Sequence, residues 1–207
     1  MKKIRPPKID WNKTGGLVPA IVQDEATLQV LMLGYMDAAA LRRTLRTRKV
    51  TFFSRTKKRL WTKGETSGHF LHLTGLAVDC DNDTLLITAR PDGPTCHRGT
   101  PSCFGDDGAS GVGFLAELDR VVVRRLKDGG TASYTARLAA EGLPRVAQKI
   151  GEEGVETALA ALAGDDEALA GEAADLLYHL IVLLRVRRLS LGDAVRVLQQ
   201  RHAPAKK

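Results

Sequence analysis

Hydrophobic and polar residues alternate through much of the first half of the chain, which is the pattern of half-buried β-strands. Five segments combine this alternation with β-branched side chains, namely residues 17–23, 28–34, 50–54, 71–78 and 85–89. A single helix is expected among them, because Asp37 is a good N-cap residue and the residues that follow it, through Arg46, suit a helix. The first half therefore predicts an α+β fold, mostly antiparallel β-sheet with one helix.

The second half of the chain changes to a helical period and has few strand signals. A first helix is expected over 114–126, and a second begins near Pro144, a residue favoured in the first turn. Asp165 can cap a third helix, and Ser190 with Asp193 resembles a capping box that opens a short fourth. The second half therefore predicts an all-α helical bundle.

A small, polar and glycine-rich stretch, residues 105–113, lies between these two textures and has the composition of a linker. We therefore expect two domains, residues 1–107 and 114–207, joined by a linker over 108–113.

The formal net charge of the 207-residue chain is +7, and residues 1–107 hold 17 Lys and Arg against 11 Asp and Glu. Such an excess raises nucleic-acid binding as one function. The basic residues of 42–59 lack the interleaved aromatics of a single-strand platform, so a small phosphorylated ligand is favoured. No run of about 18 apolar residues predicts a membrane span. Three cysteines fit a reducing compartment, and a cytoplasmic location is expected.

All three cysteines and three aspartates fall within twenty-five residues, in the pattern Asp79, Cys80, Asp81, Asp83, then Cys96, then Cys103. Thiolates suit zinc, and alternate carboxylates suit magnesium. Three thiolates leave a fourth position on zinc for a water molecule of lowered pKa. On a strand, the aspartates would face one side and Cys80 the other. Two alternatives stay open: a structural zinc with His97 as fourth ligand, and an exposed acidic turn.

A second group of carboxylates lies in the helical half. Glu153 and Glu156 are three residues apart, as are Glu172 and Asp175, so each pair shares a helix face. Antiparallel packing would gather four carboxylates, which divalent cations would stabilise. The alternative is two solvated acidic faces. Apolar neighbours argue against it, since they predict that these helices are partly buried: Val155, Ala158, Leu159, Leu176 and Leu177.

The first half resembles the phosphoribosyl-AMP cyclohydrolase family over residues 15–104. The resemblance rests on Phe53-Ser54-Arg55, Leu60-Trp61-Thr62-Lys63-Gly64-Glu65-Thr66-Ser67-Gly68, Asp79-Cys80-Asp81-Asn82-Asp83, Gly93-Pro94-Thr95-Cys96-His97 and Ser102-Cys103-Phe104. It implies that Cys80, Cys96 and Cys103 bind zinc across a dimer interface. It also implies magnesium at Asp79, Asp81 and Asp83. His69 departs from the family pattern, which has asparagine there.

This resemblance implies a reaction in which a zinc-activated water opens the adenine ring of phosphoribosyl-AMP. His97, beside a zinc ligand, is the expected proton-transfer group, with His72 as the alternative. Candidate substrate contacts in this half are Arg55, Trp61, Lys63 and Glu65.

The second half resembles the all-α nucleoside triphosphate pyrophosphohydrolases, and phosphoribosyl-ATP pyrophosphohydrolase in particular, over about residues 113–201. The matching motifs are Ser133-Tyr134-Thr135-Ala136-Arg137-Leu138, Gln148-Lys149-Ile150-Gly151-Glu152-Glu153 and Ala174-Asp175-Leu176-Leu177-Tyr178-His179-Leu180. The resemblance implies magnesium ligands among Glu152, Glu153, Glu156, Glu172 and Asp175, with Glu153 and Glu156 also catalytic. Lys149 and Arg137 are the candidates for phosphate contact.

Together the two resemblances imply a bifunctional hydrolase of histidine biosynthesis. The second domain would cleave phosphoribosyl-ATP to phosphoribosyl-AMP and pyrophosphate, and the first would open the ring of that product. The expected cofactors are Zn²⁺ and Mg²⁺, and the expected state is a homodimer with no nucleic-acid or membrane partner. A broader nucleotide-cleaning pyrophosphatase would not explain the cysteines, and a zinc-stabilised nucleic-acid-binding module would not explain the facing carboxylates.

Overall fold

The computed structural model describes residues 4, 6–105, 108–129 and 133–203, and the chain divides after Phe114 into two units. The domain boundary expected at residue 107 lies outside the described residues. The linker expected over 108–113 contains a single 3₁₀ turn, Gly111–Gly113.

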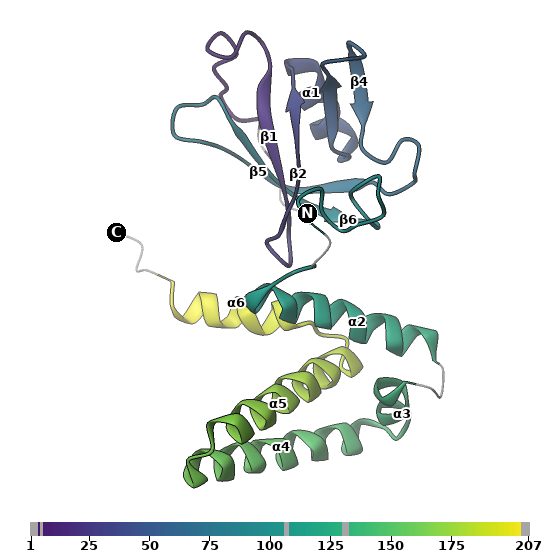
Figure 1. The fold of residues 1–207 in the computed structure, drawn as a ribbon, viewed down its shortest axis with the longest axis vertical. Helices are drawn as coiled ribbons and strands as arrows, with labels where there is room; N and C mark the ends of the chain where they lie inside the picture. Colours follow the sequence, from purple (N-terminus) through teal and green to yellow (C-terminus); the bar gives the residue numbers. More distant parts are fainter. Residues whose placement is uncertain (1–3, 5, 106–107, 130–132, 204–207) are drawn as a thin grey trace. The chain divides into compact units, whose positions relative to one another are not determined.

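The first unit is built on a four-stranded sheet in the order β2-β1-β6-β5 (Figure 1). Its strands are β1 (Val18–Asp24), β2 (Val30–Met36), β5 (Leu71–Val78) and β6 (Leu85–Pro91). The β1–β2 and β5–β6 pairs are antiparallel and the β1–β6 pair is parallel. The predicted α+β class with a mostly antiparallel sheet is therefore confirmed. Strict alternation of buried and half-buried residues along β1 shows why that strand forms.

A helix and a two-stranded hairpin complete this unit. Helix α1 (Ala38–Thr47) begins as predicted, because the Asp37 carboxylate accepts a hydrogen bond of 2.6 Å from the Ala40 amide. The hairpin pairs β3 (Thr51–Ser54) with β4 (Arg59–Thr62), and sequence reasoning missed β4. Gly34 is required at its place in β2, since a Cβ there would lie 2.4 Å from the ring of the buried Phe52.

The second unit is helical, as predicted (Figure 1). Its helices are α2 (Phe114–Asp128), α3 (Tyr134–Ala140), α4 (Leu143–Ala163), α5 (Asp166–Val186) and α6 (Leu191–Arg201). The predicted caps are confirmed, with the Asp165 carboxylate accepting from the Ala168 amide and a complete capping box at Ser190. Sequence reasoning missed α3, which has only seven residues. No helix in the described part of the chain is long and apolar enough to span a bilayer.

The buried apolar core of the second unit is small. Its fully buried apolar side chains are Val122, Leu138, Val146, Ile181 and Val182. The prediction that parts of α4 and α5 are buried is confirmed by Val146 and Glu153 on α4 and by His179, Ile181 and Val182 on α5. Most of the apolar residues from which it was argued are nevertheless exposed within a single chain. Val155 and Leu159 are 60% and 59% exposed, and Leu177 is exposed as well. The α4–α5 hairpin therefore carries an uncovered apolar face.

Candidate active sites

The α4–α5 hairpin brings three glutamates together. Glu153 and Glu156 on α4 and Glu172 on α5 each offer a carboxylate oxygen within 4.8 Å of the others. Glu153 is buried, and desolvation followed by the charges of Glu156 and Glu153 raises the pKa of Glu172. Hard oxygen donors that repel one another in this way are the donors that a divalent cation stabilises. The three glutamates therefore fit a cation such as magnesium.

Two basic side chains hold Glu153 in place. The Lys149 ammonium lies 2.7 Å from the Glu153 carboxylate, and the pKa of Lys149 is raised by this contact and by Glu152. The Nδ1 atom of His179 lies 3.5 Å from the same carboxylate and donates to the Asp175 carbonyl oxygen at 2.9 Å. The Nε2 atom of the same ring lies 3.1 Å from the Tyr134 hydroxyl oxygen, within hydrogen-bond distance. The missed helix α3 thus supports the carboxylate group through Tyr134.

The other acidic and basic candidates of the helical unit are not members of this group of three. Glu152 turns to Lys149 and Gln148, at 2.9 and 2.8 Å. Asp175 contributes its backbone carbonyl to His179, and its carboxylate lies outside the group of three. Arg137 lies in the last turn of α3 and is exposed.

A cavity of about 520 Å³ in the first unit gathers much of the cysteine motif. Its lining includes Trp61, Lys63, Cys96, His97 and Cys103. Hydrogen bonds from the Arg98 amide and the Thr100 hydroxyl lower the pKa of the Cys96 thiol, which favours the thiolate that binds metals. Desolvation and the neighbouring Cys96 raise the pKa of Cys103, and burial lowers the pKa of Lys63. The His97 ring nitrogen lies 3.8 Å from the Cys96 sulfur.

The third cysteine is placed apart from the other two. Cys80 is exposed in the turn between β5 and β6, and among the described residues no group of three metal donors within 4.8 Å includes a cysteine. One chain therefore brings together two of the three predicted zinc ligands. Cys96 and Cys103 fit zinc as a partial donor set that needs further ligands.

The three aspartates lie on this same turn, so the expectation that they lie on a strand is wrong. Strand β5 ends at Val78, and Asn82 adopts a left-handed conformation with φ of 64°. Turn geometry nevertheless places carboxylate oxygens of Asp79, Asp81 and Asp83 within 4.8 Å of one another. The Lys13 ammonium contacts Asp81 and lies 2.6 Å from Asp83, a partner that sequence reasoning missed. An ammonium between two carboxylates marks a place where positive charge is stabilised.

Three further candidates have partners of their own and are not among the residues that line the cavity. The Arg55 guanidinium lies over the Tyr35 ring, 3.8 Å from its centroid. The Glu65 carboxylate is held by Arg59 at 2.7 Å. His72 pairs with Asp92 at 2.7 Å, whereas His69 lines the cavity.

Sequence reasoning also missed two buried hydroxyls, one beside each site. Among the described residues, the side-chain polar atoms that are buried without a hydrogen-bond partner are Thr95 Oγ1 and Ser133 Oγ. Thr95 lines the cysteine cavity and precedes Cys96, and Ser133 precedes Tyr134 at the start of α3. Buried hydroxyls without a partner are rare, because an unmade hydrogen bond is costly. The only indication in the sequence is that each residue belongs to a motif that resembles one of the two families, Thr95 to the motif that ends in Cys96-His97 and Ser133 to the motif that it begins.

The fold and the two donor sets define the class of protein. Soft thiolates beside a nucleotide-sized cavity and clustered carboxylates on a helical hairpin are the donor sets of metal-assisted hydrolysis. The chain is thus a two-site hydrolase.

Comparison with known proteins specifies the family. The phosphoribosyl-AMP cyclohydrolase family matches residues 32–105, and the phosphoribosyl-ATP pyrophosphohydrolase family matches residues 115–202. The histidine biosynthesis bifunctional protein HisIE of Xylella fastidiosa strain Temecula1 is 59% identical over 95% of this chain and 94% of its own length. The proteins of that name from Vibrio cholerae and Escherichia coli K12 are each 55% identical over 94% of this chain and over 94% and 96% of their own lengths. The chain therefore belongs to the family of bifunctional histidine-biosynthesis hydrolases.

Proposed function

We propose that the two units catalyse consecutive hydrolytic steps of histidine biosynthesis. The helical unit cleaves phosphoribosyl-ATP to phosphoribosyl-AMP and pyrophosphate, and the first unit opens the adenine ring of that product. The observation that carries this proposal is the presence in one chain of a carboxylate group on α4 and α5 and of a thiol-lined cavity in the β-rich unit. The carboxylate group suits the cleavage of phosphoribosyl-ATP, and the thiol-lined cavity suits the opening of the adenine ring.

In the helical unit we assign Mg²⁺ to Glu153, Glu156 and Glu172, with Glu152 and Asp175 as outer carboxylates. Magnesium, when bound, neutralises charge on phosphate oxygens and lowers the pKa of a water molecule. Lys149 and His179 fix the orientation of the buried Glu153 carboxylate, at 2.7 and 3.5 Å. Glu153 and Glu156 are the groups that accept a proton from the attacking water, and Arg137 supplies positive charge to the phosphates.

In the first unit we assign Zn²⁺ to Cys80, Cys96 and Cys103 and Mg²⁺ to Asp79, Asp81 and Asp83. Zinc, when bound, lowers the pKa of the water that attacks C6 of the adenine. His97 at the cavity donates a proton to N1 as the C6–N1 bond breaks. Trp61 offers an aromatic face to the purine, and Lys63 offers its ammonium to a phosphate.

Two further predictions, a substrate contact and a location in the cell, belong to the proposal. Arg55 and Glu65 shape the β3–β4 hairpin and reach the substrate from its edge. The three cysteines are free thiols, which suits a reducing compartment, and we place the enzyme in the cytoplasm.

A homodimer accounts for two features that a single chain leaves incomplete. Cys80 is exposed away from the other cysteines, and Val155, Leu159 and Leu162 on α4 are 60%, 59% and 85% exposed. In a two-fold dimer each zinc site would take Cys80 from one copy and Cys96 with Cys103 from the other.

Mixing two inactive variants tests this arrangement. Cys80→Ala and Cys96→Ala are each expected to lack ring-opening activity. After unfolding and refolding together, half of the dimers would be mixed, and each would hold one intact site, so about a quarter of the wild-type activity should return. A mixture that stays inactive, although each variant remains dimeric, contradicts the shared site.

The pairing of the two reactions is tested by supplying phosphoribosyl-ATP and following pyrophosphate release and ring opening together. Cys96→Ala should stop ring opening and leave pyrophosphate release within about twofold of wild type, because the two metal sites lie in separate units. Loss of both activities in a folded Cys96→Ala protein, or retention of ring opening, would count against the proposal.

A further inference from the structure

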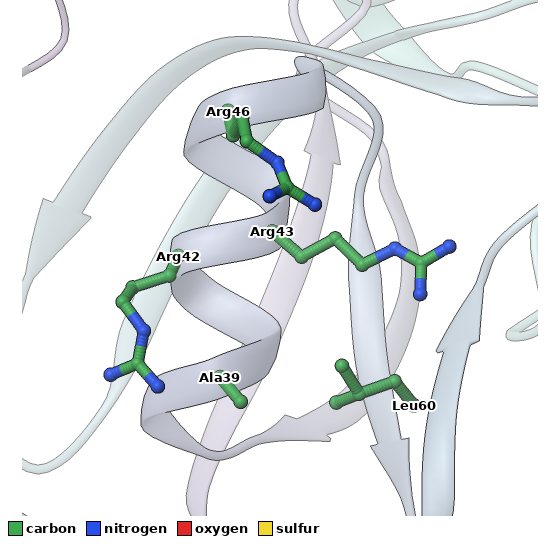
Figure 2. Close-up of a pocket in the computed structure, with 5 residues that line it drawn as sticks. All are labelled: Ala39, Arg42, Arg43, Arg46 and Leu60. Atoms are coloured by element: carbon green, nitrogen blue, oxygen red, sulfur yellow. The ribbon is translucent and has the colours of Figure 1, made fainter.

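A second cavity lies on helix α1, and none of the residues that line it is assigned above to catalysis. It has a volume of about 380 Å³ and is lined by Ala39, Arg42, Arg43, Arg46 and Leu60 (Figure 2). We propose that this arginine hollow binds the linked phosphates of a small polyphosphate, such as pyrophosphate or a nucleoside triphosphate. The proposal stands independently of the metal assignments.

The charge of the surrounding segment is strongly one-sided. Residues 38–63 contain ten Lys and Arg and no Asp or Glu. Arg42 and Arg46 are four residues apart and Arg43 and Arg46 three apart, so Arg46 neighbours both other arginines along the helix, while the Arg42 and Arg43 side chains extend to opposite sides of it (Figure 2). Like charges at these spacings destabilise a helix, and a bound anion would remove that cost.

The three guanidinium groups are not paired with carboxylates at salt-bridge distance among the described residues. None of them forms a salt bridge within the part of the chain that the structure describes. The carboxylate that acts on Arg43 is that of Glu65, and it is already engaged by Arg59 at 2.7 Å and by the Thr62 amide at 3.1 Å. The donors of Arg42, Arg43 and Arg46 are therefore available to a ligand.

The size and lining of the hollow indicate the class of ligand. Arg42 and Arg46 are separated by about 6 Å along the helix axis. A single phosphate is too small to meet all three guanidiniums, whereas two or three linked phosphates can engage them in bidentate pairs. Apart from the arginines the lining is Ala39 and Leu60, so no aromatic ring is present on which a nucleic-acid base would stack. A small polyphosphate fits these properties better than a nucleic acid.

The hollow is separate from the ring-opening cavity, although both reach strand β4. Leu60 lines the hollow and Trp61 lines the cysteine cavity. Successive residues of a strand direct their side chains to opposite faces, so the two cavities use opposite faces of β4. The two cavities share no lining residue, so a ligand in the hollow does not occupy the cysteine site.

The test compares two triple variants of the full chain that lose the same charge. Arg42→Gln/Arg43→Gln/Arg46→Gln alters the hollow, and Arg125→Gln/Arg187→Gln/Arg201→Gln alters exposed arginines of the helical unit. Binding of inorganic pyrophosphate is measured by calorimetry in about 0.1 M salt without added divalent cation, where unspecific attraction is screened. The hollow variant should bind at least about tenfold more weakly, and the control should stay within about twofold of wild type.

Three other ligands, namely ATP, inorganic monophosphate and a single-stranded oligonucleotide, test whether the hollow prefers linked phosphates. ATP should lose affinity in parallel with pyrophosphate, and inorganic monophosphate should bind wild type at least about tenfold more weakly than pyrophosphate. Equal losses in both triple variants, no loss in the hollow variant, or a larger loss for a single-stranded oligonucleotide than for pyrophosphate would each overturn the proposal. Circular dichroism checks folding, and the single variant Arg43→Gln, with an expected loss of about threefold or more, serves if the triple variant unfolds.

Discussion

Replacing Glu153 by glutamine tests the helical site with little change in shape. The substitution removes one negative charge and keeps a side chain of the same size in a buried position. Loss of a metal ligand removes several kcal/mol of transition-state stabilisation. Pyrophosphate release should therefore fall about 10²- to 10³-fold, while opening of the ring of supplied phosphoribosyl-AMP stays within about twofold.

The contacts of Glu153 predict that stability changes much less than activity. Its carboxylate lies 2.7 Å from Lys149 Nζ, and this attraction favours the folded state. Carboxylate oxygens of Glu156 and Glu172 lie within 4.8 Å and repel it. Because glutamine loses both the attraction and the repulsion, Glu153→Gln should change the free energy of unfolding only slightly when divalent cations are absent.

Added magnesium should make wild type more stable than the Glu153→Gln variant. At a concentration of 100 times Kd, a cation that binds only the folded state stabilises wild type by about 2.7 kcal/mol. This raises the midpoint of thermal unfolding of the helical unit by several degrees, and the variant should gain much less. The matched control is Glu167→Gln, which makes the same charge change at an exposed position on α5. Wild-type pyrophosphate release together with wild-type stabilisation by magnesium in Glu153→Gln would refute the assignment.

Three further substitutions probe the fold and the assembly. Gly34→Ala should lower the free energy of unfolding of the first unit, measured in urea, by about 1–3 kcal/mol, because the new Cβ would lie 2.4 Å from the Phe52 ring; an unchanged free energy of unfolding would contradict that packing. Ser190→Ala removes the N-cap of α6 and should cost about 1 kcal/mol in thermal unfolding, whereas the exposed control Ser110→Ala, whose side chain makes no cap hydrogen bond, should cost far less. Leu159→Glu adds a charge to the exposed face of α4 and should convert dimers to monomers in light scattering; a dimer of undiminished stability would exclude that face from the interface.

The parts of the fold that sequence predicted are those set by neighbouring residues. Asp37, Asp165 and Ser190 were read as caps because a cap depends on a hydrogen bond within three residues. Strand β4 was missed because its sequence continues a basic run, and only pairing with β3 makes it a strand. Helix α3 was missed because seven residues give too short a period to recognise.

In the candidate sites, too, sequence predicted what neighbouring residues determine and missed what depends on distant residues. The spacing of Glu153 and Glu156 places both on one helix face, so their proximity follows from helix geometry. The separation of Cys80 from the other cysteines, and the contact of Lys13 with Asp81 and Asp83, arise where loops and a distant segment meet. The alternation argument failed at the aspartates because the chain turns directly after Val78, where a strand period no longer applies.

The hydroxyl of Thr95 allows a contact with substrate to be separated from a contribution to the fold. Thr95 is 2% exposed, lines the cysteine cavity and has no hydrogen-bond partner for Oγ1. Thr95→Val keeps the shape and removes a buried hydroxyl with no bond to lose, so stability should be unchanged or rise by about 1 kcal/mol. If that hydroxyl binds the substrate, kcat/KM for ring opening should fall about 5- to 30-fold, which corresponds to one lost hydrogen bond of about 1–2 kcal/mol. Thr62→Val is the matched control, since its hydroxyl bonds to Thr51 at 3.0 Å and its loss should lower stability. A Thr95→Val protein with lowered stability and unchanged ring opening would show that the hydroxyl serves the fold through a bound water, and not the substrate.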